Sequence, residues 1–377
     1  MAGEESVLPP NAFEKEGYTF VGWAVVSGGE VRIYDEDEIK DLGTPGKTIT
    51  LYAVWEADSV AYKVEHYVMN TSGSYPASPT NVQTKNGKAD TSLTLANLKL
   101  TTSTYNVANG IIYSHGTVGG SAATSTTVLP DGSRVIKLYY KRTYGTLTTT
   151  AGTNIASVTT QSKVKYYYGA TVPSLSATLK TQTGYTFAFS KWTSSASYMS
   201  NKTTATISSF TWPAMPEGTA ITLTASATKT ANTYTVEYYS YDGGTKYGSS
   251  SHTYDTAKNL TTIANLNATA PSGKTFIGWA ASANSTTISK TDGQSVNNLT
   301  STNNGVIKLY AIWRSAGVQL TYKSGVNSAT STTSDTYYYY NGATSVSITP
   351  GAPASVTSWT TLGWRDDTTA GAKEYSS

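Results

Sequence analysis

The residue types that most often perform chemistry are scarce in this chain of 377 residues. It has no cysteine, which excludes disulfides, thiolate metal sites and a cysteine nucleophile. Its 3 histidines, His66, His115 and His252, lack the spacing of metal ligands. Serine is abundant, but no segment resembles the nucleophile elbow of a hydrolase. We therefore predict no catalytic residue, no cofactor and no metal site, and we expect that the protein is not an enzyme.

The charged residues also give no sign of a binding site. The densest acidic run, residues 35–38, lacks the Asp-x-Asp-x-Asp-Gly pattern of a calcium loop, and we interpret it as a solvated loop or helix start. The net charge is +3, and the lysines and arginines are not clustered with aromatic residues. Such a distribution argues against nucleic acid as a partner.

Tyrosine, with 29 copies, is the residue type best suited to ligand contact. Two runs, 166–168 and 337–340, consist of tyrosine alone. Because side chains alternate across a strand, half of each run can face solvent, where tyrosine suits sugar rings or partner surfaces. The alternative is that a neighbouring module covers these rings. The candidate contact residues are Tyr166, Tyr168, Tyr338 and Tyr340.

The elements that position these residues are expected to be strands. Only 14% of the residues are charged, against about 25% in ordinary soluble domains, and threonine, serine, glycine and asparagine fill the polar positions. Threonine and tyrosine favour a pleated, half-buried surface. No apolar run approaches the ~20 residues of a membrane span, so we expect no membrane insertion in this segment. The predicted fold class is mostly β.

A strand-like segment with alternating apolar residues recurs along the chain. Its aligned leucines are Leu51, Leu138, Leu223 and Leu309, which gives steps of 87, 85 and 86 residues. A second element ends in tryptophan and keeps the same spacing, and glycine directly before Trp23 and Trp279 marks a strand bulge or a close backbone approach. The tryptophans predicted to anchor the core are Trp23, Trp55, Trp192, Trp279, Trp313 and Trp364.

This spacing divides the chain into five repeat units. The predicted units are 1–57, the C-terminal half of a module; 58–142, 143–230 and 231–314, three whole modules; and 315–377, the N-terminal half of another. The junctions are short and contain no proline-rich or Gly/Ser-rich spacer, so we expect an elongated, semi-rigid array. The incomplete first and last units indicate a fragment of a longer array.

Two segments resemble a known family. GYTFVGW with ITLYAVWE, and GKTFIGW with VIKLYAIWR, are similar to the Listeria–Bacteroides repeat, the module of internalin B-repeat regions. The segment 62–141 resembles a mucin-binding-protein type of repeat, whereas 143–230, with three residues inserted before its tryptophan, and 317–377 match less well. These resemblances imply small β-grasp-like modules on Gram-positive cell surfaces, which act as spacers or in weak adhesion and carry no catalytic residues.

Two functions of different class follow from these observations. The first is a non-catalytic stalk or adhesive segment of a bacterial cell-surface protein that presents a distal domain. The alternative is a module that binds glycan or mucin through exposed tyrosine and tryptophan rows. The expected partners are host glycan, mucin or surface protein, together with the neighbouring repeats. The expected location is extracellular, at the cell wall, with the signal peptide and anchor outside this segment.

Overall fold

The computed structural model describes residues 6–30, 33, 38–39, 46–101, 110–323, 332–348, 364–365 and 374–375. Strands account for 51% of the chain and helices for 2%. The helices of the described part are two short 3-10 segments, η1 (Leu95–Leu98) and η4 (Ile263–Asn265). The mostly β fold class predicted from composition is therefore confirmed.

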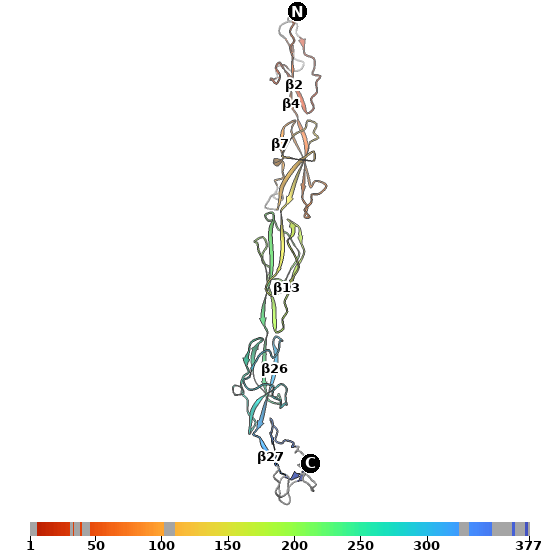
Figure 1. Ribbon diagram of the computed structural model, residues 1–377. Coiled ribbons are helices and arrows are strands. Elements are labelled where there is room, and N and C mark those ends of the chain that lie inside the picture. Colours follow the sequence, from red (N-terminus) through yellow and green to blue (C-terminus); the bar gives the residue numbers. More distant parts are fainter. Residues whose placement is uncertain are drawn as a thin grey trace, which may run out of the picture. The chain divides into compact units, whose positions relative to one another are not determined.

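The first sheet lies between residues 59 and 142 and has five strands (Figure 1). In spatial order they are β6 (Asn81–Lys88), β5 (Ser59–Val68), β11 (Val135–Arg142), β8 (Ile111–Val118) and β9 (Ser121–Ala123). β5 and β11 run parallel, and the other neighbouring pairs are antiparallel. A parallel pair requires a long crossover connection, and here β6 to β10 of the chain lie between the two strands.

The second sheet lies between residues 144 and 231 and has four strands. In spatial order they are β14 (Val164–Tyr167), β12 (Tyr144–Ala151), β20 (Thr219–Ala231) and β17 (Tyr185–Ser194). β12 and β20 form the central parallel pair. Two smaller sheets accompany it, formed by β13 (Ile155–Val158), β16 (Leu175–Leu179) and β18 (Thr206–Ile207), and by β15 (Thr171–Val172) and β19 (Phe210–Thr211).

The third sheet lies between residues 233 and 315 and repeats this design. In spatial order its strands are β22 (Lys246–Thr253), β21 (Thr233–Tyr239), β26 (Gly305–Ser315) and β24 (Lys274–Ala280). The central strands β21 and β26 are again parallel. All three sheets therefore share a central parallel pair with a further strand on either side, and in the first and third sheets both flanking strands are antiparallel to it.

The remaining strands form pairs. These are β1 (Ser6–Val7) with β3 (Glu38–Ile39), β2 (Tyr18–Ala24) with β4 (Tyr52–Ala57), β7 (Ser92–Thr94) with β10 (Ser125–Thr127), β23 (Lys258–Asn259) with β25 (Ser295–Val296), β27 (Val318–Lys323) with β28 (Thr332–Tyr337), and β29 (Trp364–Arg365) with β30 (Glu374–Tyr375). β2 and β24 each have a register shift at the glycine before tryptophan. The bulge predicted from Gly22 and Gly278 is therefore present.

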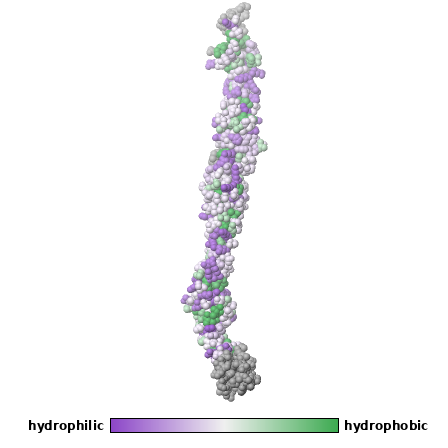
Figure 2. All heavy atoms as spheres, viewed as in Figure 1, coloured by the Kyte–Doolittle hydropathy of each residue, from purple (hydrophilic) through white to green (hydrophobic). Residues whose placement is uncertain are grey.

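Each of the three sheets has its own hydrophobic cluster. Period-two alternation places one side of each central strand in the cluster, as the burial of Leu138, Leu223 and Leu309 shows. These are three of the four leucines that mark the repeat spacing. On the face shown in Figure 2, the apolar residues form small groups among neutral and hydrophilic ones.

The chain divides into two compact units. The first comprises Met1–Leu179 and Phe189–Ala227, and the second comprises Lys180–Ala188 and Thr228–Ser377. The division falls inside β17 and β20. The five repeat units expected from the sequence are a different, finer division and stay a prediction.

Candidate functional site

The predicted contact tyrosine Tyr166 lies in β14 and is half-buried. Its ring stacks on Trp212 with 5.3 Å between ring centroids, and its hydroxyl donates a 2.9 Å hydrogen bond to Gln161 Oε1. Tyr168 is also half-buried, and it packs against the hydrophobic cluster of the first sheet. The guanidinium of Arg142 lies 5.8 Å from its ring centroid. Both rings thus contribute to packing within the chain.

The second pair of predicted contact tyrosines, Tyr338 and Tyr340, follows β28. Both side chains are half-buried, and their ring centroids lie 6.5 Å apart in an edge-to-face arrangement. The guanidinium of Arg314 lies 4.1 Å from the Tyr338 ring centroid. The structure therefore keeps Tyr338 and Tyr340 together, whereas Tyr166 and Tyr168 pack against different hydrophobic clusters. All four side chains are half-buried. Their role in ligand contact stays a prediction.

The predicted core tryptophans differ in burial. Trp192, Trp279 and Trp313 are buried, whereas Trp23 and Trp55 are half-buried. The side chain of Trp364 lies outside the described residues. A further tryptophan, Trp212, is fully buried in the second cluster, and the sequence reasoning missed it. It does not belong to either recurring tryptophan motif, so the repeat spacing carried no signal for it.

Two of the three histidines are buried in separate sheets. His66 Nδ1 lies 2.9 Å from the Tyr140 hydroxyl, and His252 Nε2 lies 2.9 Å from Ser250 Oγ. Burial lowers the pKa of both imidazoles, because it penalises the charged form. His115 is exposed and stacks on Tyr139. The described residues contain no group of three or more His, Cys, Asp or Glu side chains placed to hold a metal ion.

The first sheet carries an ordered group of aromatic and charged side chains on its parallel pair. Tyr67 and Tyr139 are register partners, and their rings stack with centroids 5.1 Å apart. The Tyr67 hydroxyl donates a 2.8 Å hydrogen bond to Glu65 Oε2. Lys137 Nζ lies 3.8 Å from Glu65 Oε2 and 5.5 Å from the Tyr67 ring centroid. Stacking, hydrogen bonding and charge are thus combined in one group of four residues.

The third sheet repeats this group at equivalent positions. Tyr239 and Tyr310 are register partners and stack with centroids 5.8 Å apart. The Tyr239 hydroxyl donates a 2.9 Å hydrogen bond to Glu237, and Lys308 lies 5.3 Å from the Tyr239 ring centroid. Lys246 also donates a hydrogen bond to Glu237, and these bonds hold the pKa of that carboxyl below its ordinary value. We call the two groups the tyrosine pairs.

A short sequence pattern marks the tyrosine pairs, although it is less conspicuous than the tyrosine runs at 166–168 and 337–340. Glu-x-Tyr occurs at 65–67 and 237–239, and Lys-x-Tyr occurs at 137–139 and 308–310, all within the recurring strands. The arrangement offers stacking, hydrogen bonds and paired charges. Tyr67 is buried, and the other three rings are half-buried. A nucleophile with an adjacent base is not part of either group.

The three small sheets combine parallel and antiparallel strands in one recurring design, and each has its own core. These features are typical of β-proteins built from repeats. Residues 1–54 and 234–312 match the family model described as the Listeria-Bacteroides repeat domain. This match confirms the resemblance drawn from the GYTFVGW and GKTFIGW motifs. The family is a non-catalytic repeat family typical of bacterial surface proteins. No curated protein matches the chain.

The mucin-binding resemblance of residues 61–142 stays an expectation. The two matched segments contain Trp23 and Trp279 at the same place in their motifs. In the described part of the chain, no helix is long and apolar enough to cross a membrane.

Proposed function

We propose that this chain is a non-catalytic stalk segment of a bacterial cell-surface protein, built from the five tandem β-grasp-like repeat units given above. The observation that carries this proposal is the recurrence of one sheet design, together with the family match at residues 1–54 and 234–312. A parallel central pair joined by a long crossover, with antiparallel strands outside, supports the β-grasp assignment of the units.

The proposed location is the Gram-positive cell wall, where the segment holds a distal domain away from the cell and makes weak surface contacts. Two chemical features support it. The chain has no cysteine, and its polar surface relies on hydroxyl and amide side chains more than on charges. Because each repeat has its own hydrophobic cluster, repeats can be added to or removed from an array without a change in the cores of their neighbours.

A display experiment tests the stalk. The 377-residue chain is placed between a wall anchor and a reporter domain on a Gram-positive cell, and antibody access to the reporter is measured. We expect greater access with the chain than with a short flexible linker of Gly and Ser. Equal access would contradict the proposal. Reproducible turnover of peptidoglycan that one point mutation abolishes would contradict the non-catalytic assignment.

A second candidate function is glycan or mucin binding. The recurrence of the tyrosine pairs at two sheets favours it, because the half-buried ring of Tyr310 and the nearby ammonium of Lys308 are suited to sugar contact. Binding of the whole chain to mucin and glycan arrays tests it. Tyr310→Ala is expected to weaken such binding, whereas Tyr198→Ala, at a 42% exposed ring elsewhere, serves as the control. Absence of any binding by the unaltered chain would remove this candidate.

A further inference from the structure

Two polar contacts of the same geometry occur where, on the proposed repeat scheme, one repeat meets the next. At the first, the N–H of Asp58 donates to Gly17 O at 2.8 Å, and Thr19 Oγ1 donates to Asp58 Oδ1 at 2.6 Å. The hydroxyl of Tyr18 donates to Asp90 Oδ2 at 2.6 Å. Three consecutive residues at the start of β2 therefore contact two separate points of the segment that follows β4.

The second contact has the same three bonds. The N–H of Asn232 donates to Gly184 O at 2.9 Å, and Thr186 Oγ1 donates to Asn232 Oδ1 at 2.6 Å. The hydroxyl of Tyr185 donates to Asp255 Oδ2 at 2.7 Å. Equivalent atoms take equivalent roles at two places in the chain, so the arrangement is a recurring feature of the protein.

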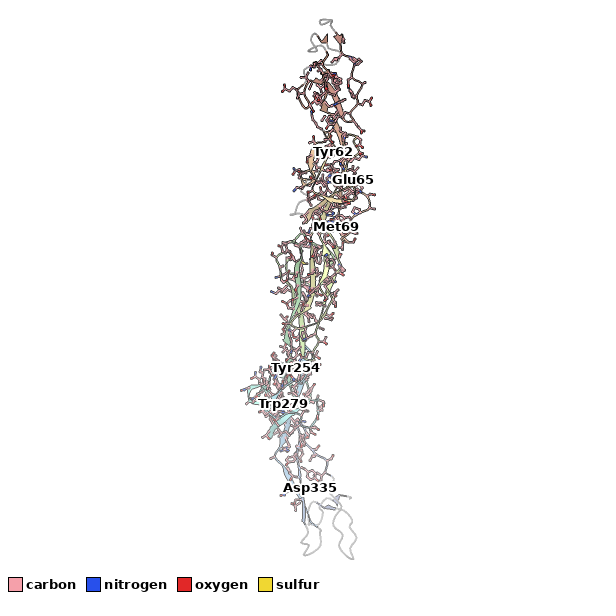
Figure 3. All side chains as sticks on the ribbon, turned by 45° about the horizontal axis from the view of Figure 1, so that its top comes forward. Tyr62, Glu65, Met69, Tyr254, Trp279 and Asp335 are labelled. Carbon is pink, nitrogen blue, oxygen red and sulfur yellow. The ribbon has the colours of Figure 1, made fainter. Side chains whose placement is uncertain are left out.

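Glycine is required at the first position of both contacts for two reasons. Gly17 and Gly184 have φ angles of +73° and +80°, in the left-handed region that side chains rarely adopt. A Cβ atom would also lie 2.8 Å from Pro130 at Gly17 and 2.2 Å from the Tyr254 ring at Gly184 (Figure 3 labels Tyr254). The absence of a side chain therefore lets the following segment approach the strand closely.

The acceptor carboxylates are held in place by their own backbone. Asp90 and Asp255 have φ angles of +61° and +57°, which aspartate tolerates better than most residues. Asn298 Nδ2 donates to Asp255 Oδ1 at 2.7 Å and leaves Oδ2 for Tyr185. The hydrogen bonds from these two residues lower the pKa of Asp255, so the carboxylate is the favoured form.

A third place has the same backbone frame with different side-chain bonds: Arg142 Nη1 donates to Tyr168 O at 2.9 Å, and Lys141 forms an ion pair with Glu217. The N–H of Thr143 donates to Gly110 O at 2.8 Å, and Gly110 has a φ angle of +70°. Ile111 and Ile112 follow this glycine, where the other two contacts have tyrosine and threonine. The backbone frame thus occurs at three places, and the tyrosine and threonine bonds occur at two of them.

We propose that Gly-Tyr-Thr at the start of β2 and of β17 forms a docking surface for the next repeat, which we call the Tyr-Thr clasp. Its partner is a repeat that begins with aspartate or asparagine and carries aspartate at the left-handed turn. The proposal rests on the proposed repeat scheme. The backbone bond alone would leave a hinge at these two places, whereas the added bonds at two separated points restrain rotation about it. The tyrosine bond is charge-assisted at both places, because its acceptor is an aspartate. A junction with an intact clasp therefore bends less than the same junction without the tyrosine and threonine bonds.

Spin labels on the whole chain test the first clasp, which lies within one compact unit. The chain has no cysteine, so cysteines introduced at the exposed positions Val21 and Ser121 are labelled selectively. We expect a narrow distance distribution in the otherwise unaltered chain and about twice the width in the double variant Tyr18→Phe and Thr19→Val. Tyr67→Phe is the control, because it removes a tyrosine–carboxylate bond of 2.8 Å inside the first sheet.

Amide exchange on the same proteins reports whether the clasp opens. The Asp58 amide is expected to exchange about five- to tenfold faster in the double variant, the effect of one net hydrogen bond. If the double variant unfolds, the single variant Tyr18→Phe takes its place in both measurements, because it removes only one oxygen atom. Equal distance widths in the variants and the unaltered chain, or a broad distribution in the latter, would overturn the proposal. The two proposals can fail separately. If the distance widths depend on the clasp as expected but the chain gives no greater reporter access on cells than the flexible linker, only the stalk function is rejected.

Discussion

Replacement of Trp279 by alanine tests whether the hydrophobic core of each sheet is independent of the others. Trp279 lies in β24, is fully buried, and contacts Phe276 and Tyr238 with ring centroids at 4.9 and 5.0 Å (Figure 3). Its indole Nε1 has no hydrogen-bond acceptor among the described residues. The side chain therefore stabilises the third sheet by packing alone, and its removal leaves no polar partner behind.

The expected loss is large relative to the stability of a small domain. Replacement of a buried tryptophan by alanine typically costs about 3–5 kcal/mol, and a domain has only about 5–15 kcal/mol of unfolding free energy. For a unit of this size each kcal/mol lowers the melting temperature by about 4–8 °C. The third sheet of Trp279→Ala should therefore melt at least about 12 °C lower than that of the unaltered chain.

Calorimetry of the whole chain combined with localised amide exchange measures this effect. Exchange should accelerate between residues 233 and 315 and stay unchanged in the first sheet, whose cluster shares no residue with that of the third. Trp23→Ala is the matched control, because Trp23 holds the same motif position but is only half-buried, and its loss should cost less. Unchanged exchange in the third sheet would refute the core role, and uniform loss of protection in all sheets would refute their independence.

The other predictions concern backbone, pH and size. Gly184→Ala should destabilise the chain more than Gly218→Ala, because both glycines have φ near +80° but only Gly184 has a ring within 2.2 Å of the added Cβ; thermal melts compare them. The pKa values of His66 and His252 are lowered from 6.5 by burial, so the unfolded chain binds these protons more readily, and stability should fall as pH decreases below 6.5. Melts at several pH values should show this loss, and His66→Gln should reduce it; a flat profile would contradict it. Small-angle scattering should give a radius of gyration well above the ~21 Å of one compact domain of this length, and a value near 21 Å would contradict the repeat array.

The sequence alone determined the local features of the fold. Period-two alternation around Leu138 and Leu309 predicted strands with one buried side, and the glycines before Trp23 and Trp279 predicted the bulges. The repeat spacing and its motifs also identified the family of two segments. These features depend on neighbouring residues, so a single sequence carries them directly.

The tertiary structure decided which of these elements meet. The pairing of Glu65 with Lys137 and the bond from Tyr18 to Asp90 join residues about 70 positions apart, and strand register has no local signal over such a distance. Burial of equivalent residues also differs by context. Trp279 lies in a four-stranded sheet, where Tyr238 of β21 packs against it. Trp23 lies in a two-stranded sheet and is half-buried. The motif is the same in both places, and the number of strands around it sets how much water is excluded.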